Sequence, residues 1–514
     1  MLEAVVNRLV QMGHEVTVIC AAGGYAGCGG RRADGSGQRA DGGEQAAANC
    51  QRPIDPPPTA NGPQPTVVRL RASRFGRRTF VGKLADYVSF YLGAAWKLLM
   101  LHPRPDRIIA LTTPPYLSLL ARLVSKLRGA DHAHWVMDLY PDVMVAHGML
   151  ADGGWKHRLL AAFARWGFGG GRCASILTLG PDMAERASVG SGRRPEAGQR
   201  LAERDSSCPE TPQPTPDRQS PTVSWVPLWG SGEGGAVGRG RLAEGGGSVA
   251  GPVVASGAGG ESEVDQLAVG GGRLAENELP DVPNQNPKSK IQNPKSALRA
   301  KRGWRDDERV VMYSGNMGLG HRFGEFLEAA RRLGVRSGQL AAGADRGKEP
   351  MPGAQARQPT ANRQPVRFVF YGGGKRRGEI AAFMREHPNC AVELHDYAPA
   401  EELAEHLLSA DVHLASLDAA WTGTMVPSKL QGIFAVGRPV IFVGSPESSI
   451  GRWVTESGGG WVVEPDDVEG LLAALNEAGD PEVCMARGNA AVGFAKSHFD
   501  KKTNATRVAE IFTR

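Results

Sequence analysis

Residues 310–327 read VVMYSGNMGLGHRFGEFL, residues 366–384 read VRFVFYGGGKRRGEIAAFM, and residues 422–443 read TGTMVPSKLQGIFAVGRPVIFV. In the first two stretches a run of β-branched and aromatic residues stops at a glycine, and a helical pattern follows. The third stretch is a polar loop that leads into a helix and then a strand. Strands that alternate with helices in this way predict βαβ units and a parallel sheet.

The loops between these elements are the first candidates for a binding site. In open parallel sheets, ligands bind beyond the carboxyl ends of the strands. The loops Ser314–Gly318, Gly372–Gly374 and Gly423–Lys429 are expected at that edge. Because glycine-rich loops present backbone N–H groups there, they suit a phosphate-bearing ligand.

Six short sequences carry a resemblance to a known family. They are YSGNMG (Tyr313–Gly318), DYAPAEELAEHLLSADVHLASL (Asp396–Leu417), VPSKL (Val426–Leu430), AVGRPVIF (Ala435–Phe442), HWVMDLYPDV (His134–Val143) and SWVPLWG (Ser224–Gly230). The chain resembles the family 4 glycosyltransferases of the GT-B fold, in the subgroup that builds bacterial surface polysaccharides such as colanic acid or O-antigen. The resemblance extends over nearly all of the chain outside a few insertions. It implies an α/β protein with two Rossmann-like domains facing a cleft.

Composition separates the expected domains from insertions. Four stretches are rich in Gly, Pro, Gln, Ala and Arg and almost free of aromatic residues: Gly24–Pro65, Gly190–Pro221, Ala236–Ala297 and Arg336–Pro365. They cannot bury enough apolar surface to order themselves, so we expect them to be disordered. Words such as RLAE and QNPKS recur in them, which favours repetitive sequence inserted into surface loops over a tether or a partner-binding segment.

Three parts of the chain follow from this division. We expect an N-terminal domain over residues 1–229, a disordered linker over 236–297, and a C-terminal domain over 300–496. The resemblance implies that the N-terminal domain binds the acceptor and the C-terminal domain the nucleotide sugar. The resemblance implies that a last helix, at 503–512, packs back on the first domain.

The start of the chain departs from the family pattern. Family members begin with a strand and a glycine-rich loop, whereas this chain opens in a helical pattern at Leu2. We therefore expect the first strand of the N-terminal sheet to be missing, through a start codon assigned too late or a truncation. Further strands are expected at Val16–Cys20, Val67–Arg71, Arg107–Leu111, His132–Val136, Ser175–Leu179 and Val223–Val226. Helices are expected at Leu84–Leu101, Tyr116–Leu127, Trp155–Phe168 and Asp182–Ala187.

Charge is unevenly spread along the chain. The formal net charge is only +6, but between Arg71 and Arg104 seven Lys or Arg residues accompany a single acid, Asp86. The same region contains the apolar run LADYVSFYLGAAWKLLML (Leu84–Leu101). Basic residues beside an aromatic-rich helix suit the interface of an anionic membrane; a buried helix with a solvated basic flank is the alternative. We expect a peripheral protein on the inner face of the plasma membrane.

The cysteines bear on the compartment and on metal binding. Seven of them are scattered without CxxC or His/Cys ligand spacing, and no signal peptide opens the chain. This pattern is typical of reduced thiols in a cytoplasmic protein. We expect no metal and no cofactor.

The diphosphate of a nucleotide-sugar donor needs amides and cations. The SGNMG loop supplies the amides, and family members add an Arg and a Lys just beyond it. Here Arg322 or His321 would stand in for the arginine, and Lys429 in VPSKL is the other expected cation. Lys429 could instead be a solvated lysine at a helix end, and Arg322 an ordinary surface charge. The remaining residues expected to contact the donor are Ser314, Gly315, Asn316, Gly318, Gly372, Gly373 and Ser428.

The family's paired-glutamate motif is not intact. Gln431-Gly432 occupies the place of the second glutamate, which normally bonds the nucleotide ribose. Residues that could face the transferred sugar instead are Asp418, Thr422, Gly423, Thr424 and Glu447.

Acceptor activation is assigned to Asp138, at the end of a strand where relatives carry a His or Asp facing the cleft. Its carboxylate could accept the proton of the acceptor hydroxyl or orient that hydroxyl, and the alternative is a turn residue before Pro141. His134, inside the strand, is expected to be a packed side chain.

The sequence therefore predicts a glycosyltransferase that moves a sugar from a nucleotide diphosphate to a lipid-linked or growing polysaccharide acceptor. UDP is the first candidate for the nucleotide. The resemblance implies retention of anomeric configuration. Two other functions remain open: a degenerate sugar-nucleotide-binding or scaffold protein, and a UDP-sugar 2-epimerase on the same fold. The epimerase would need its own acid and histidine set, and the scaffold would show no donor hydrolysis.

Deleting Ala236–Ala297 tests the assignment of the insertions. Because this segment is poor in apolar residues, its removal should change the free energy of unfolding by less than about 1 kcal/mol, as for surface changes generally. Thermal denaturation of both forms measures this. Loss of the cooperative transition in the deleted form would show that the segment is structural.

Overall fold

The stretches 310–327, 366–384 and 422–443 contribute strands to one parallel sheet. The computed structural model describes residues 1–21, 64–71, 73, 80–169, 172–191, 222–227, 299–342, 364–399 and 402–514. Six strands lie in the order β12-β11-β10-β7-β8-β9, and every pair is parallel. Their bounds are β7 (Arg309–Ser314), β8 (Val366–Tyr371), β9 (Val392–His395), β10 (Val412–Ser416), β11 (Val440–Val443) and β12 (Gly460–Val463).

The two faces of β7 explain its continuous apolar run. Val311 and Tyr313 pack into a core with Phe323 and Phe326, whereas Val310 and Met312 pack on the opposite face with Trp304 and Val369. A strand buried on both faces reads as unbroken apolar sequence because successive side chains point to opposite sides. The helices of this half are α9 (Gly324–Ala342), α10 (Arg377–Glu386), α11 (Leu403–Leu408), α12 (Lys429–Ala435), α13 (Ser449–Ser457), α14 (Val468–Glu477) and α15 (Pro481–His498), with a 3₁₀ turn η3 at Ala419–Trp421.

The first half of the chain has two separate sheets. Strands β1 (Thr17–Ala21) and β2 (Thr66–Leu70) pair with each other, and the four strands β3-β4-β5-β6 form a second parallel sheet. The four strands are β3 (Arg107–Leu111), β4 (Asp131–Trp135), β5 (Cys173–Thr178) and β6 (Thr222–Trp225). The helices are α1 (Leu2–Gln11), α3 (Phe80–Met100), α4 (Leu117–Arg128), α5 (Asp142–Ala146), α6 (Trp155–Phe168) and α7 (Pro181–Ser191).

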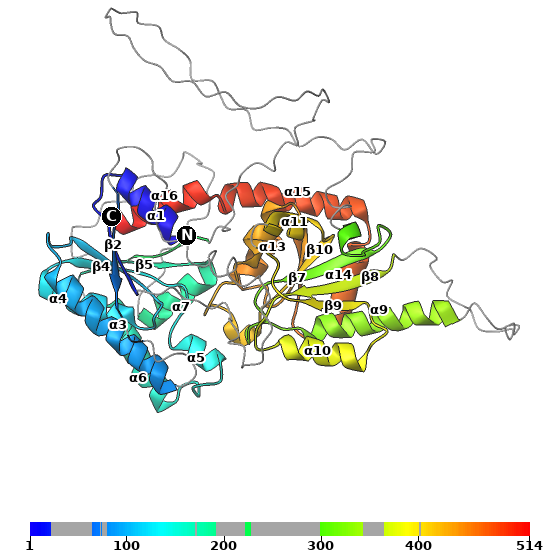
Figure 1. Cartoon of the computed structure of the whole chain (residues 1–514), viewed down its shortest axis with the longest axis horizontal. Coiled ribbons are helices and arrows are strands. Elements are labelled where there is room, and N and C mark those ends of the chain that lie inside the picture. Colours follow the sequence, from blue (N-terminus) through cyan, green and yellow to red (C-terminus); the bar gives the residue numbers. More distant parts are fainter. Residues whose placement is uncertain are drawn as a thin grey trace, which may run out of the picture. The chain divides into compact units, whose positions relative to one another are not determined.

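The last helix returns to the first half of the chain. Helix α16 (Lys501–Thr513) packs against α1 and β5, and Figure 1 shows it in red beside α1 in blue. The Phe512 ring meets that of Trp135 on β4 edge to face, with centroids 5.9 Å apart. The side chain of Arg107 on β3 donates to the carbonyl oxygen of Phe512. The structure thus shows the expected return of this helix.

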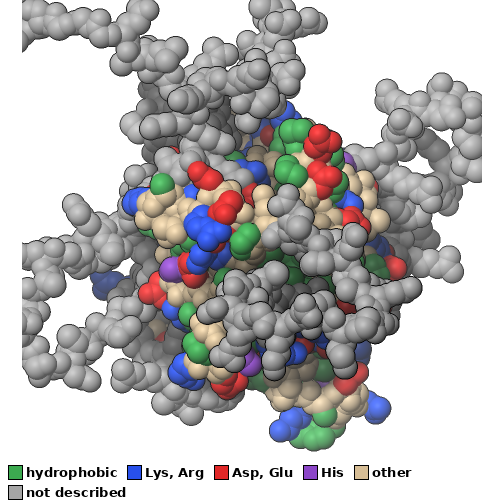
Figure 2. Space-filling view, turned by 90° about the vertical axis from the view of Figure 1, so that its right-hand side faces the viewer, with side chains coloured by type: hydrophobic (Ala, Val, Ile, Leu, Met, Phe, Trp, Pro, Cys, Tyr) green, Lys and Arg blue, Asp and Glu red, His purple; other side chains and the backbone are tan. Residues whose placement is uncertain are grey.

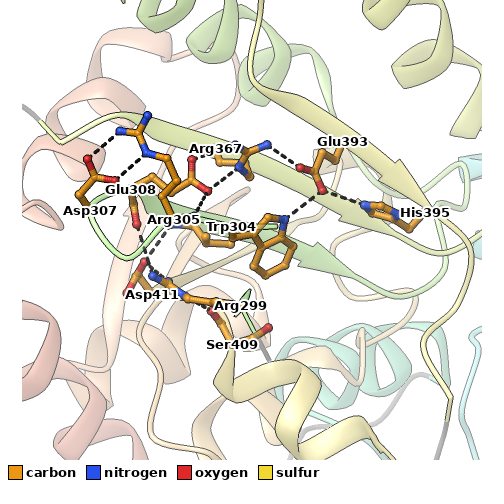
Figure 3. Close-up of polar contacts among 11 residues, drawn as sticks. Arg299, Trp304, Arg305, Asp307, Glu308, Arg367, Glu393, His395, Ser409 and Asp411 are labelled. Carbon is orange, nitrogen blue, oxygen red and sulfur yellow. Dashed lines mark hydrogen bonds and ion pairs between the residues drawn. The ribbon is translucent and has the colours of Figure 1, made fainter. Parts of the chain in front are cut away.

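Charged side chains secure the segment that leads into the C-terminal sheet (Figure 3). Arg367 on β8 bonds the carboxylate of Glu308, ahead of β7, at 2.8 and 2.9 Å, and that of Glu393 on β9 at 2.5 Å. The Trp304 indole donates to Glu393 at 3.1 Å. Glu308 is buried, and a buried carboxylate needs such partners because desolvation disfavours its charge.

Some expected boundaries need correction. Helix α7 continues to Ser191 and α9 to Ala342, past the expected starts of insertions at 190 and 336. Helix α9 extends because its sequence keeps helix-forming Arg336, Gln339, Leu340 and Ala341 beyond that point, whereas α7 passes the expected boundary only by Gly190 and Ser191. The expected insertion 236–297, and nearly all of 24–65 and 192–221, lie outside the described residues. Within the described residues, no helix combines the length and the hydropathy needed to cross a bilayer.

The returning helix predicts a stability effect. Phe512 is almost fully buried, so Phe512→Ala should cost about 3–5 kcal/mol of unfolding free energy through lost packing. Chemical denaturation measures this, with Lys502→Ala on the exposed face of α16 as the control. Equal midpoints for the two variants would contradict the packing described here.

Candidate functional site

The loops after β7 and β8 lie against each other at the carboxyl edge of the C-terminal sheet. The N–H of Gly315 donates to the carbonyl oxygen of Tyr371 at 2.9 Å, and that of Met317 to Gly373 at 2.7 Å. Gly372 has a φ of +133°, and a Cβ on it would lie 2.0 Å from the Gly315 oxygen. Glycine is required there because any side chain would collide with the neighbouring loop. The expected N–H groups of Gly315 and Gly372 are therefore engaged, Gly372 donating to His395.

Lys429 reaches back over this loop from the start of α12. Its amine lies 3.0 Å from Nε2 of His321, 3.4 Å from the carbonyl oxygen of Asn316 and 4.9 Å from the centroid of the Tyr313 ring. Gly315 makes the approach possible, because a Cβ on it would lie 2.7 Å from Cε of Lys429. The structure thus brings together Lys429, His321 and the SGNMG loop, which the sequence had placed far apart.

The protonation of this pair follows from its contacts. Nδ1 of His321 lies 2.7 Å from the carbonyl oxygen of Ser416, so it carries the proton and leaves Nε2 as the acceptor for the Lys429 amine. Burial and the nearby Lys429 lower the pKa of His321 to about 3, so the ring is neutral. Burial lowers the pKa of Lys429 to about 7. No ion pair of Lys429 with a carboxylate is present in the described part of the chain, so its charge is available to an anion.

Arg322 has a different environment. Its guanidinium lies 2.6 Å from the carboxylate of Glu325 and 3.5 Å from that of Asp418, and it also pairs with Asp466. Three carboxylates already compensate its charge, so it is a weaker candidate for the diphosphate than Lys429. Arg322 lines a pocket of about 270 Å³ whose other lining residues are Gly324, Glu325, Arg376, Asp418, Asp466 and Val468.

The loop after η3 bonds to the first half of the chain. The N–H of Gly423 donates to the carboxylate of Asp182 at 3.1 Å, and Arg186 donates to the carbonyl oxygen of Thr422 at 3.0 Å. The Thr424 hydroxyl donates to the carbonyl oxygen of Trp421. Polar groups of this loop are therefore used within the protein, and the expected contacts of Thr422, Gly423 and Thr424 with a sugar stay a prediction.

Two other expected donor ligands lie at the surface. The exposed Ser428 stands at the N-cap of α12 without a side-chain cap bond. Glu447 is 3.4 Å from Arg452, which also pairs with Glu185 on α7 at 2.8 Å. The Ser314 hydroxyl lies 3.0 Å from Nε2 of His406, so that side chain is engaged by helix α11.

Asp138 lies where the two halves of the chain meet. It forms a β-bridge with Met425, and the next residue, Leu139, donates to the carbonyl oxygen of Thr424 at 2.9 Å. Burial raises the pKa of the Asp138 carboxyl. A carboxylate with a raised pKa is a better proton acceptor, which agrees with the expected role at the acceptor.

The described residues contain one cluster of possible metal ligands outside this edge. His132 and His134 on β4 and Cys173 on β5 are buried, with ligand atoms within 4.8 Å of one another. Nδ1 of His132 bonds the Ser125 hydroxyl at 3.0 Å, and burial lowers its pKa to about 4. His134 packs its ring on Phe168, as expected for a core side chain. The cluster lies within the strands β4 and β5.

Comparison with known proteins gives two family matches. Residues 1–199 match the glycosyl transferase 4-like domain, and residues 353–479 match the glycosyl transferases group 1. The chain belongs to the family 4 glycosyltransferases of the GT-B fold. The resemblance inferred from the six short sequences is thereby confirmed, and so is the expectation of a transferase at the level of the family.

Single relatives are more distant. The chain is 27% identical over 185 residues to WcaI of Escherichia coli (strain K12), whose name assigns it to colanic acid biosynthesis as a glycosyl transferase. That match covers 35% of this chain and 38% of WcaI, so it spans well under half of the relative.

Solved structures confirm the fold. WaaG, a glycosyltransferase involved in lipopolysaccharide biosynthesis, aligns with a TM-score of 0.52 and 14% identity over 100% of this chain and 95% of WaaG. A glycosyltransferase from Rickettsia africae ESF-5 aligns with a TM-score of 0.52 and 8% identity over 100% and 94% of the two chains.

Sequence reasoning missed one cation at this edge of the sheet. Arg376, two residues after the Gly372–Gly374 loop, donates to the carbonyl oxygen of His321 and lines the pocket with Arg322. The run KRR directly after three glycines was the available signal. The adjacent Lys375 acts on the other half of the chain: burial, and after it the charge of Lys375, lowers the pKa of His147, which directly follows α5.

The low pKa of Lys429 predicts pH-dependent diphosphate binding. Above about pH 7 the free amine is neutral, so an anion that favours the charged amine must bind together with a proton. Affinity for a nucleoside diphosphate should therefore fall as pH rises from 7 to 9, by up to about tenfold per pH unit. Calorimetry in buffers of different ionisation enthalpy measures the proton uptake.

The matched variants make this result specific. Lys429→Gln should remove the proton uptake, and Lys502→Gln, on the exposed face of α16, should keep it. Binding of the diphosphate by the wild-type protein without any proton uptake at pH 8.5 would contradict a neutral Lys429 in the free site.

Proposed function

We propose that this protein transfers a sugar from a UDP-sugar to a lipid-linked or growing polysaccharide acceptor in surface glycan biosynthesis. One observation carries the proposal: the half-buried Lys429 amine, held by His321 at the carboxyl edge of the sheet, lacks a carboxylate partner among the described residues. A cation placed in this way stabilises the negative charge that develops on a leaving diphosphate.

The bond changes assign a role to each group. The bond from the anomeric carbon to the diphosphate breaks, and its electron pair stays on the diphosphate oxygen beside Lys429. The acceptor hydroxyl oxygen bonds to the anomeric carbon, and its proton passes to the Asp138 carboxylate or to the leaving diphosphate. The resemblance supports retention of configuration, which the stereochemistry of the product would test.

The donor contacts are assigned by position. His321 fixes the Lys429 amine, and the Ser314–Gly318 and Gly372–Gly374 loops border it. Asp418, Arg322 and Arg376 line the adjoining polar pocket, which suits the hydroxyl groups of a sugar. UDP as the nucleotide, and a reaction without a metal or cofactor, are carried by the family resemblance.

The acceptor and the location belong to the same proposal. A lipid-linked acceptor would bring the protein to the inner face of the plasma membrane as a peripheral protein. The partial match to WcaI, whose name refers to colanic acid biosynthesis, supports a surface polysaccharide as the product class.

Two substitutions test the assignment of roles. Lys429→Ala should lower turnover by about 10²-fold or more, a loss of about 2.7 kcal/mol. Donor affinity should weaken less than turnover falls, because leaving-group charge grows along the reaction. Asp138→Asn should slow transfer and leave donor binding nearly unchanged, because Asp138 faces the acceptor in this assignment.

A panel of UDP-sugars with a lipid-linked acceptor extract supplies the assay, and Lys502→Ala is the control for a lysine outside the site. Wild-type turnover in Lys429→Ala would reject Lys429 and make Arg322 the leading cation. Donor binding without transfer or hydrolysis under every condition would favour the scaffold function.

A further inference from the structure

Large apolar side chains are exposed on three neighbouring helices of the first half of the chain. Eleven of the eighteen large apolar side chains that are exposed among the described residues belong to α3, α4 and α6. They are Leu84, Val88, Leu92, Trp96 and Met100 on α3, Leu123 and Leu127 on α4, and Trp155, Leu159, Phe163 and Trp166 on α6. Trp96 and Leu92 are both 67% exposed, and Trp155 is 72% exposed.

The spacing of these residues puts them on one side of each helix. On α3 they recur at every fourth residue, and on α6 at intervals of four, four and three, so each set forms a single stripe. The opposite sides face the protein: Leu98 and Leu99 of α3 pack on a core with Ala121 and Val124 of α4. The stripes are therefore additional to the apolar surface that the fold itself buries.

The three helices form one layer. Helix α4 packs against α3 and against α6, and Figure 1 shows the three together beside the N-terminal strands. Their outward stripes consequently join into one apolar surface, which we name the three-helix face. Patches of this kind mark interaction sites, because monomeric proteins rarely expose so much contiguous apolar area.

The charges on α4 and α6 have one sign. The sequences of α4 (LSLLARLVSKLR) and α6 (WKHRLLAAFARWGF) contain six Lys or Arg residues and no Asp or Glu. Lys126, Arg158 and Arg165 are exposed, and the Arg122 guanidinium lies 4.4 Å from the Trp166 ring centroid. In the whole chain 60 basic residues accompany 54 acidic ones, and Figure 2 shows both signs interspersed on another face.

We propose that the three-helix face docks on an anionic lipid bilayer, with its aromatic and aliphatic stripes in the headgroup and acyl boundary and its basic residues on the lipid phosphates. Helices with an apolar side rich in Trp and Leu and with flanking Lys and Arg bind membranes in this orientation. The absence of acids from α4 and α6 favours lipid over a protein partner, whose surface would carry both signs. The proposal adds α4 and α6 to the single segment, Leu84–Leu101, that the sequence had suggested.

Docking on this face would place Asp138 near the membrane. Helix α4 follows the loop after β3, in which the Thr112 hydroxyl accepts from the N–H groups of Met137 and Asp138 at 3.0 and 3.3 Å. Tyr91 of α3 donates to the carbonyl oxygen of Pro115 in the same loop. The purpose of docking rests on the proposed function, since a lipid-linked acceptor would reach Asp138 from the bilayer. Docking itself can be measured without sugar transfer.

Vesicle sedimentation with the full chain tests the proposal. The wild type should bind vesicles of phosphatidylcholine with phosphatidylglycerol, bind phosphatidylcholine alone more weakly, and be partly released by added salt. The double variant Leu92→Ser/Trp96→Ser should bind the mixed vesicles at least about tenfold more weakly. Lys126→Glu/Arg158→Glu should lose at least about tenfold on the same vesicles and little on neutral ones.

Matched substitutions elsewhere serve as controls. Met485→Ser, at a similarly exposed apolar position on α15, and Lys502→Glu on α16 should bind like the wild type. Circular dichroism and binding of UDP should be unchanged in all variants, which separates failure of docking from failure of the proposed function.

Three results would overturn the proposal. They are no sedimentation of the wild type at low salt, equal losses in the control variants, and a wild-type dimer that Leu92→Ser/Trp96→Ser dissociates without affecting vesicle binding. The last result would assign the three-helix face to a second copy of the chain.

Discussion

All strands of the C-terminal sheet are parallel, so every loop that follows a strand emerges at the same edge. The close pairing of β7 with β8 depends on glycine, because Gly315 and Gly372 let their loops touch through backbone atoms alone. Gly315 also leaves room for Lys429, which comes from a segment more than a hundred residues later in the chain. The site thus follows from strand direction first and from side-chain chemistry second.

The chemistry of the edge depends on what surrounds each cation. Lys429 contacts a neutral imidazole, a carbonyl oxygen and an aromatic ring, whereas Arg322 contacts carboxylates. Removal from water raises the free energy of the Lys429 ammonium, and a bound diphosphate would restore the lost stabilisation. Arg322 gains less from an added anion because acids already balance it. His321 contributes by position, since the bond from its Nδ1 to Ser416 sets the tautomer that accepts from Lys429.

The halves of the chain bury their apolar surface differently. The C-terminal strands are enclosed on both faces, and Val310–Tyr313 are fully buried. The N-terminal sheet is covered by α3, α4 and α6, whose outer sides keep Trp96, Leu92 and Trp155 in solvent. Apolar surface that the fold does not need, together with the purely basic charge of α4 and α6, is the physical basis for assigning the three-helix face to lipid.

The sequence by itself determined the fold and most of its elements, because strand and helix periodicity are local and six short sequences carried the family resemblance. Helix α6 and strand β3 have the predicted bounds, and α16 was predicted to return to the first half. Only the tertiary structure decided which of these two cations pairs with carboxylates, because Asp418 and Asp466 of Arg322, like His321 of Lys429, lie far away in the sequence. It also decided that the Leu84–Leu101 stripe is continued by α4 and α6, since helix packing joins faces that no local pattern connects.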